Sequence, residues 1–236
     1  RETPDGPKLP DFGAGSSQTP MPPAVAERYV ARRGYANYWY NRESQQRLWR
    51  AYLQRSNMEG IGKRWRLAGS LERGDTFAME FDEDRAEIRL PWGRSGAIFT
   101  GDVAGQLSPP RSGGLLLAIH AWQQLVDKGL DRFGEVSYLG ALPHGPDDVV
   151  EDCLVGLYEG MEVRFFFSAP DGDLTGIELF AADDADPCEV AFSHFGEVAG
   201  RRLPLRWWVR SGDEVFAELV IEHWHVADAV PRQSAE

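Results

Sequence analysis

One stretch of this chain decides its fold, and it begins with CLVGLYEGMEVRFFF at residues 153–167. Apolar residues occupy alternate positions on both sides of the Glu-Gly turn at residues 159–160, with Cys153, Val155 and Leu157 before it and Val163 and Phe165 after it. Alternation of this kind, broken by turn residues every ~10–15 positions, is typical of short strands that follow one another in an antiparallel sheet. Residues 149–226 therefore predict a β-meander with one apolar face.

Two further groups of elements precede the meander. Residues 65–100 alternate in the same way and predict a first group of strands, with residues 97–100 as a short fourth strand. Residues 115–126 instead repeat their apolar positions every three to four residues, which predicts a buried helix with Ser112 as its cap and Gly129 as its stop. We expect an α+β fold, a curved antiparallel β-sheet that forms a half-open β-barrel wrapped around helices.

The ends of the chain differ from this central part. Residues 1–23 contain six prolines among Gly and Ser and are expected to form a disordered linker or tail, while residues 227–236 form a second tail. Residues 24–226 then make a single domain. The chain begins at Arg1 without an initiator Met or a signal-peptide core, so we expect that a leader was removed or that the domain was excised from a longer protein.

An N-terminal helical region opens the expected domain. Residues 24–33 are compatible with one helix, and Asn41 can cap a second. On this second helix, Leu48, Tyr52 and Leu53 form an apolar stripe that we expect to pack against the rest of the domain.

Composition excludes several classes of partner. The chain has 236 residues, of which 42% are hydrophobic, so it can bury a sizeable core. Its formal net charge of −12 argues against binding to nucleic acid, whose phosphates it would repel, and against a polybasic membrane surface role. No apolar run approaches the ~18–20 residues of a membrane-spanning helix, so the protein is not expected to span a membrane.

No catalytic or metal-binding motif emerges from the titratable residues. His120 lies on the expected buried helix and is interpreted as a packed residue, while His144 lies in a Pro-His-Gly-Pro loop and is expected to be solvated. His223 and His225 share one face of a strand and could bind a metal, but no third ligand can be identified. Nucleophile motifs are missing, and acidic clusters coincide with turns. We therefore expect no catalytic residue, no metal site and no cofactor.

The two cysteines, Cys153 and Cys188, both fall on or beside expected strands. Two separate buried thiols are the favoured interpretation. A disulfide in an oxidising compartment and a metal-binding pair remain as alternatives.

The most prominent feature is apolar surface. A curved sheet and a helix of wide apolar arc can leave a groove that accepts an apolar ligand. The alternative is that the helices fill this space completely. The side chains expected to line the groove come from the helix and from the meander: Leu116, Trp122, Val163, Phe165, Phe167, Ile177, Leu179, Trp207 and Val209.

The segment FGEVAGRRLP at residues 195–204 carries a family resemblance. Its Gly-x-x-Leu-Pro pattern, followed by a strand, a turn at residues 211–213 and a final strand, resembles the outer-membrane lipoprotein-sorting proteins of the LolA/LolB/RseB-like group. The order of helix, strands, helix and strands over residues 24–226 supports it. The resemblance implies a LolA-like half-barrel, export to the periplasm or cell envelope, and a carrier or sensor that holds acyl chains or a polypeptide.

Two functions follow as hypotheses. The first is a non-catalytic binding module of the cell envelope, whose partner is a lipid, another hydrophobic small molecule or another envelope protein. The second is a regulatory or interaction domain attached to an upstream enzyme such as a secreted protease. A hydrolase that uses scattered carboxylates or the His223 and His225 pair is a third and much weaker hypothesis.

Overall fold

The structure is a computed structural model, and it describes residues 36–169, 171–182 and 185–228. By internal contacts the chain divides into residues 1–37 and residues 38–236, and the fold described here is that of the second unit. The expected tail at residues 1–23 and helix at residues 24–33 lie outside the described residues, as do residues 229–236.

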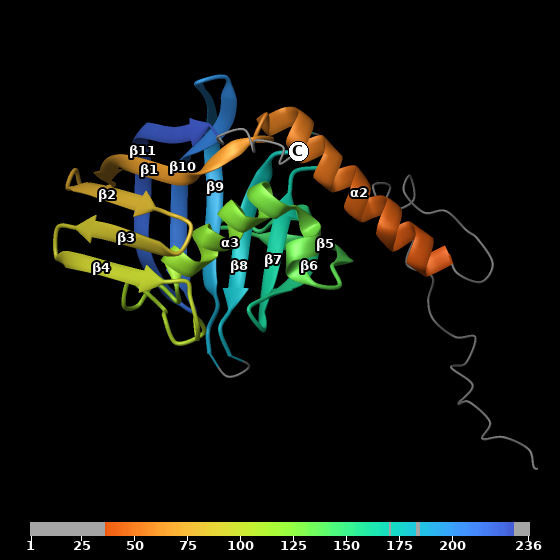
Figure 1. The fold of residues 1–236 in the computed structure, drawn as a ribbon, viewed down its shortest axis with the longest axis horizontal. Helices are drawn as coiled ribbons and strands as arrows, with labels where there is room; N and C mark the ends of the chain where they lie inside the picture. Colours follow the sequence, from red (N-terminus) through yellow and green to blue (C-terminus); the bar gives the residue numbers. More distant parts are fainter. Residues whose placement is uncertain (1–35, 170, 183–184, 229–236) are drawn as a thin grey trace, which may run out of the picture. The chain divides into compact units, whose positions relative to one another are not determined.

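The strands of the described residues form one antiparallel sheet of eleven strands (Figure 1). Its strand order is β4-β3-β2-β1-β11-β10-β9-β8-β7-β6-β5, so adjacent strands are consecutive in sequence except where β1 pairs with β11. This single long-range pairing joins the first strand group to the end of the meander. The strand bounds are β1 Ile61–Leu71, β2 Thr76–Phe81, β3 Arg85–Leu90, β4 Gly93–Ile98, β5 Ser137–His144, β6 Val149–Tyr158, β7 Met161–Phe167, β8 Leu174–Phe180, β9 Cys188–Val198, β10 Arg201–Ser211 and β11 Glu214–Asp228.

The expected fold class is confirmed. The sheet is open between its edge strands β4 and β5, and the helix α3 (Leu115–Lys128) lies across it in front of β8 and β9 (Figure 1). Every residue of α3 from Leu115 to Val126 is buried, as its wide apolar arc predicts. The hydroxyl of Ser112 accepts the backbone N–H groups of Gly114 and Leu115 at 3.2 and 3.0 Å, and Gly129 ends the helix.

Two strand predictions need correction. The fourth strand is β4, which begins at Gly93 and ends at Ile98, before the expected residues 97–100 are complete. Phe99 still donates to the carbonyl of Asp84, and the chain then bends at residues 100–101, where Gly101 has a φ of 80°. The return segment at residues 133–146 contains an additional strand, β5. The sequence hides it because Gly140 makes a register shift and Pro143 interrupts the usual strand pattern, both of which an edge strand tolerates.

The helix α2 (Ala36–Ser56) begins before Asn41, so the expected cap at Asn41 is wrong. Asn41 lies inside the helix, and its amide bonds with the backbone of Tyr138 on the edge strand β5: Nδ2 donates to the carbonyl at 2.8 Å, and Oδ1 accepts the N–H at 2.9 Å. Gln45 Nε2 donates to the carbonyl of Val136 at 2.6 Å. Two side chains of α2 thus satisfy backbone groups along the β5 edge, which would otherwise be open to pairing with another chain.

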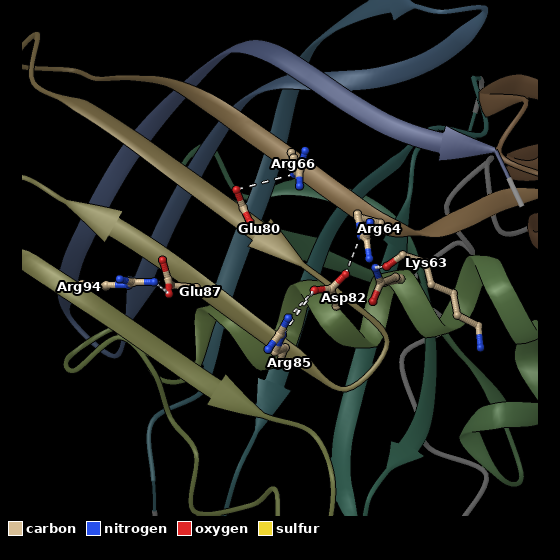
Figure 2. A network of polar contacts seen from close by, with 9 residues as sticks. Lys63, Arg64, Arg66, Glu80, Asp82, Arg85, Glu87 and Arg94 are labelled. Carbon is tan, nitrogen blue, oxygen red and sulfur yellow. Dashed lines mark hydrogen bonds and ion pairs between the residues drawn. The ribbon is translucent and has the colours of Figure 1, made fainter.

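The outer face of strands β1–β4 is a ladder of charges (Figure 2). Glu80 and Glu87 lie directly opposite each other on β2 and β3, and each has a cation beside it, Arg66 at 3.7 Å from Glu80 and Arg94 next to Glu87. The ladder continues where Arg64 contacts Asp82 at 2.8 Å. The ladder keeps this face in water, which leaves the opposite face to the core.

Candidate functional site

The structure brings all nine expected ligand-lining residues together on the concave face of the sheet, in one apolar cluster with α3. Each of them is at most 2% exposed. That a ligand binds among them remains a prediction. Because these side chains are packed within one buried cluster, a ligand would have to displace the side chains that pack against them. Their positions are Leu116 and Trp122 on α3, Val163, Phe165 and Phe167 on β7, Ile177 and Leu179 on β8, and Trp207 and Val209 on β10.

The helix α2 covers one side of this cluster. Its buried side chains are Ser44, Leu48, Tyr52 and Ser56, one residue per turn, so its buried seam is narrow and half polar. The Tyr52 ring packs edge-on against Phe167, with 5.9 Å between ring centroids, and its hydroxyl accepts the Trp122 indole N–H at 2.8 Å. The apolar stripe expected on this helix is thus present in Leu48 and Tyr52, while Leu53 is only partly buried.

The first ion pair of α2 with the rest of the domain involves a buried carboxylate. Arg47 Nη2 lies 3.3 Å from Oδ2 of Asp152 on β6, whose side chain has no exposed surface, whereas the arginine side chain is 42% exposed. The hydroxyl of Tyr138 donates to the other oxygen of Asp152 at 2.7 Å. Asp152 therefore keeps a hydrogen bond even when Arg47 moves away.

The second ion pair of α2 has the same arrangement, an exposed arginine beside a buried carboxylate. Arg55 Nε lies 3.7 Å from Oδ1 of Asp173. Arg202 of β10 donates two hydrogen bonds to the same carboxylate, from Nε at 2.8 Å and from Nη2 at 2.9 Å. Arg55 is 44% exposed and Asp173 only 6%. A bidentate arginine–carboxylate pair is a strong contact, and Asp173 retains it without Arg55. At both points α2 adds a cation to a carboxylate that the rest of the domain already holds.

Sequence reasoning missed these two carboxylates. The alternation of Cys153, Val155 and Leu157 predicted the opposite face of β6 as the apolar one, and that prediction is wrong: Leu157 is 56% exposed, whereas Leu154 and Tyr158 are buried. Asp152 lies on the same face as Leu154 and Tyr158, so the sequence pattern placed it on the solvent side. Asp173 follows the Asp-Gly turn at residues 171–172, where it resembles an ordinary turn residue, so no local signal distinguishes it.

His120 on α3 is a packed residue, as expected. Its ring stacks on Phe99 with 3.7 Å between centroids, Nδ1 accepts the hydroxyl of Tyr158 at 2.6 Å, and Nε2 lies 3.2 Å from the carbonyl of Glu83. Burial lowers the pKa of His120 from 6.5 to about 4. The ring is therefore neutral at pH 7, and its two nitrogens serve packing rather than proton transfer.

This depressed pKa predicts a loss of stability in acid. The unfolded chain takes up the His120 proton near pH 6.5 and the folded chain only near pH 4, so the neutral ring stabilises the fold fully above pH 6.5. We expect the free energy of unfolding to fall by up to about 3 kcal/mol as the pH decreases from 6.5 to 4. Urea unfolding at several pH values measures this loss. His120→Asn should flatten the slope, and an equal slope in both proteins would contradict the assignment.

His144 is not solvated, and that prediction is wrong. Residues 142–151, the β5–β6 arm, extend past the end of β7 and fold over the outer face of the sheet. His144 is 5% exposed there and stacks on Phe166 with 4.1 Å between centroids. Neither ring nitrogen has a hydrogen-bond partner among the described residues, and Nδ1 lies 3.6 Å from Oε1 of Glu178. A loop motif cannot reveal that its hairpin will fold over a sheet.

The remaining titratable groups bear on metal binding and on thiol chemistry. No group of three or more His, Cys, Asp or Glu residues there could hold a metal ion. Cys153 and Cys188 are free, and both are buried, which confirms two separate thiols. Burial raises the pKa of Cys153 to about 12, so its thiol stays protonated at neutral pH.

Comparison with known proteins gives a structural likeness and no match in sequence. No family model matches the chain, and no curated protein matches it. Among solved structures, a LolA superfamily protein from Nitrosomonas europaea is similar, with a TM-score of 0.39 and 10% identity over 78% of this chain and 91% of that chain. Among the described residues, no helix is long and apolar enough to cross a membrane.

Proposed function

We propose that this domain is a non-catalytic binding module of the cell envelope that holds an acyl chain or an apolar peptide segment against the concave face of its sheet. The nine buried residues would line the ligand, and α2 would be the cover that moves to admit it. The observation that carries the proposal is the attachment of α2, a narrow seam flanked by two half-exposed arginines. Each arginine faces a carboxylate that keeps another partner when the helix leaves.

The energetic cost of opening this cover is small compared with that of opening the sheet. Exposing Leu48 and Tyr52 costs about 1.5–3 kcal/mol for each side chain. Each ion pair with a solvent-exposed partner adds ~0–1 kcal/mol. The hydrogen bonds of Asn41 and Gln45 to the backbone of residues 136 and 138, and that of Trp122 to Tyr52, add about 0.5–1.5 kcal/mol each. Removing a strand would break a whole ladder of backbone hydrogen bonds as well. The open state is then a minor population, and the apparent ligand affinity falls in proportion to that population.

Binding of dansyl-undecanoic acid to the full chain tests the proposal. We expect its fluorescence to rise on binding and to fall again when palmitate displaces it. Hydrogen exchange in residues 40–56 should become faster with the ligand bound, because the cover is displaced, while exchange in β7 and β8 stays slow. Absence of any displaceable binding would disprove the interior site, as would binding that leaves exchange in α2 unchanged.

A pair of variants tests the role of the two arginines. Arg47→Ala combined with Arg55→Ala removes both cations that face the buried carboxylates, and we expect the apparent affinity for the probe to increase about fivefold to tenfold. The matched control combines Arg42→Ala with Arg50→Ala on the exposed side of the same helix, where Arg50 donates to Gln46. This control should change the affinity less than twofold. Equal effects of the two pairs would show that total charge, not the cover, governs binding.

Location in the cell envelope belongs to the same proposal. It is supported by the resemblance of residues 195–204 to exported lipoprotein-sorting proteins. Fractionation of cells that produce the natural full-length protein tests it, and recovery in the cytoplasm would contradict it.

A further inference from the structure

A second surface feature lies away from the interior site, at the sheet end where the β3–β4 turn meets the start of β11. Trp92 is 61% exposed there and Val215 is 55% exposed, and the Trp92 ring packs edge-on against Phe216 with 6.2 Å between centroids. A groove of about 520 Å³ runs on one side of Trp92, between Gly93–Ser95 and Pro109–Arg111. A second hollow of about 450 Å³ is also lined by Trp92, together with Val215 and Phe216. The same large aromatic side chain thus borders two open hollows.

One wall of this groove is the free edge of β4. Along this strand, alternate residues direct their backbone N–H and C=O groups away from β3. Two of these outward positions are already satisfied: the Ser108 hydroxyl donates to the carbonyl of Gly96 at 2.8 Å, and Gln106 Oε1 accepts the N–H of Ile98. The backbone groups of Gly96 and Ile98 therefore point away from β3. Because this direction alternates along a strand, the backbone groups of Arg94 point away from β3 as well.

The loop that contains Gln106 and Ser108 covers the edge of β4 at Ile98 and Gly96 but does not reach Arg94. After Ser108 the chain continues as Pro109 and Pro110, which have no backbone N–H, and these residues form the opposite wall of the groove. Among the described residues, the outward backbone groups of Arg94 have no partner. The Arg94 side chain is turned to Glu87 on the outer face of the sheet (Figure 2). Only the backbone of Arg94 is thus available toward the groove.

We propose that this groove binds an extended segment of a partner polypeptide, which adds a short strand to β4 at Arg94 and packs an apolar side chain on Trp92. A free strand edge beside an apolar hollow is the arrangement by which peptides bind through β-augmentation, with backbone hydrogen bonds and side-chain pockets acting together. An acyl chain could fill the hollow but could not use the outward N–H and C=O groups of Arg94. The strand edge therefore selects a polypeptide.

Charge indicates the kind of segment. Arg111, 77% exposed, lies over the groove and pairs with Glu214, which is itself 66% exposed. An ion pair so open to water exchanges partners at little cost, so an acidic residue of the bound segment can take the place of Glu214. The occupant is then an apolar residue with an acidic neighbour, in extended conformation. This binding involves none of the nine interior residues and does not depend on movement of α2.

Selection of a phage-displayed library of random peptides on the immobilised full chain tests this proposal. We expect enriched peptides that combine an apolar residue with an acidic one, and we expect a synthetic copy of the best peptide to bind in fluorescence polarisation. Trp92→Ala should weaken that binding at least tenfold. Arg111→Ala should remove the preference for the acidic residue.

Two variants of one residue separate strand pairing from side-chain effects. Arg94→Pro deletes the outward N–H, which the pairing with β3 does not use, and should weaken peptide binding about fivefold to tenfold. Arg94→Ala keeps that N–H and should change binding less than threefold. Circular dichroism confirms that both variants fold. Failure to enrich any peptide over the Trp92→Ala protein would overturn the proposal, as would equal binding to the two Arg94 variants.

Two parallel measurements test whether a lipid surface or a second copy of this chain occupies the groove instead. Flotation with phosphatidylglycerol vesicles that depends on Trp92 would overturn the proposal in favour of a lipid surface. A dimer in light scattering that Trp92→Ala dissociates would overturn it in favour of a second copy of this chain. The interior site can fail its fatty-acid test while peptide binding succeeds, so the two proposals fail separately.

Discussion

Replacing Trp122 by alanine is expected to lower the free energy of unfolding by about 4 kcal/mol, which is in the upper range for buried aromatic truncations. The indole lies at the centre of an aromatic cluster, with ring-centroid distances of 5.1 Å to Trp65, 5.0 Å to Phe192 and 6.0 Å to Trp224. Its N–H also donates to Tyr52, so the substitution loosens α2 as well. Four elements, α3, β1, β9 and β11, therefore depend on this one side chain.

Urea unfolding followed by circular dichroism measures this effect, and Trp92→Ala is the matched control. The control removes the same side chain from a position that is 61% exposed, so we expect a change below about 0.5 kcal/mol. A similar loss of stability in both variants would mean that the aromatic cluster does not carry the core. Near-ultraviolet circular dichroism should also lose intensity only in Trp122→Ala, because the rigid tryptophans lie together around that residue.

Adding one methyl group at Gly176 is expected to release the β5–β6 arm and to cost about 2–3 kcal/mol. A Cβ at this position would lie 1.7 Å from Nε2 of His144, so the ring and the methyl group cannot occupy the same place. The His144 ring must leave its stack on Phe166, and the arm at residues 142–151 follows it. The absence of a side chain at Gly176 therefore leaves the space in which the His144 ring packs against the sheet.

Hydrogen exchange and limited proteolysis of the arm measure its release. Gly105→Ala is the control, because a Cβ there meets no atom within 4 Å and its cost should be near zero. In the double variant Gly176→Ala with His144→Ala the clash is absent, so its stability should exceed that expected from adding the two single effects. Additive effects would show that His144 and Gly176 do not act as a pair.

Much of the sheet could be predicted from residues that lie side by side in sequence. Alternation at Trp65 and Leu67, or at Val163 and Phe165, identified strands because a pleated backbone sends successive side chains to opposite faces. The wide apolar arc of residues 115–126 identified α3 in the same way. Prediction failed at β5, where Pro143 and the bulge at Gly140 break the local pattern, and at Asn41, whose side chain bonds to a distant backbone instead of capping its own helix.

The candidate site was predicted only in part. The nine apolar residues were expected to share one face and they do, but alternation could not say whether the space before them is open or filled. The two buried carboxylates Asp152 and Asp173 were missed because their partners on α2 lie more than a hundred residues away in sequence. The free edge of β4 could not be predicted either, since an edge is defined by the strand order of the whole sheet.

The local alternation of residues 153–167 and of the strands around them determined, by itself, an antiparallel sheet with one apolar face and a helix to pack on it. Only the tertiary structure decided that β1 pairs with β11, that Tyr52 of α2 fills the space beside Phe167, and that His144 is buried under its own hairpin. The physical reason is the range of the interaction. Side-chain direction along a strand is set by the backbone of neighbouring residues, whereas strand order, covering helices and open edges depend on contacts between distant segments.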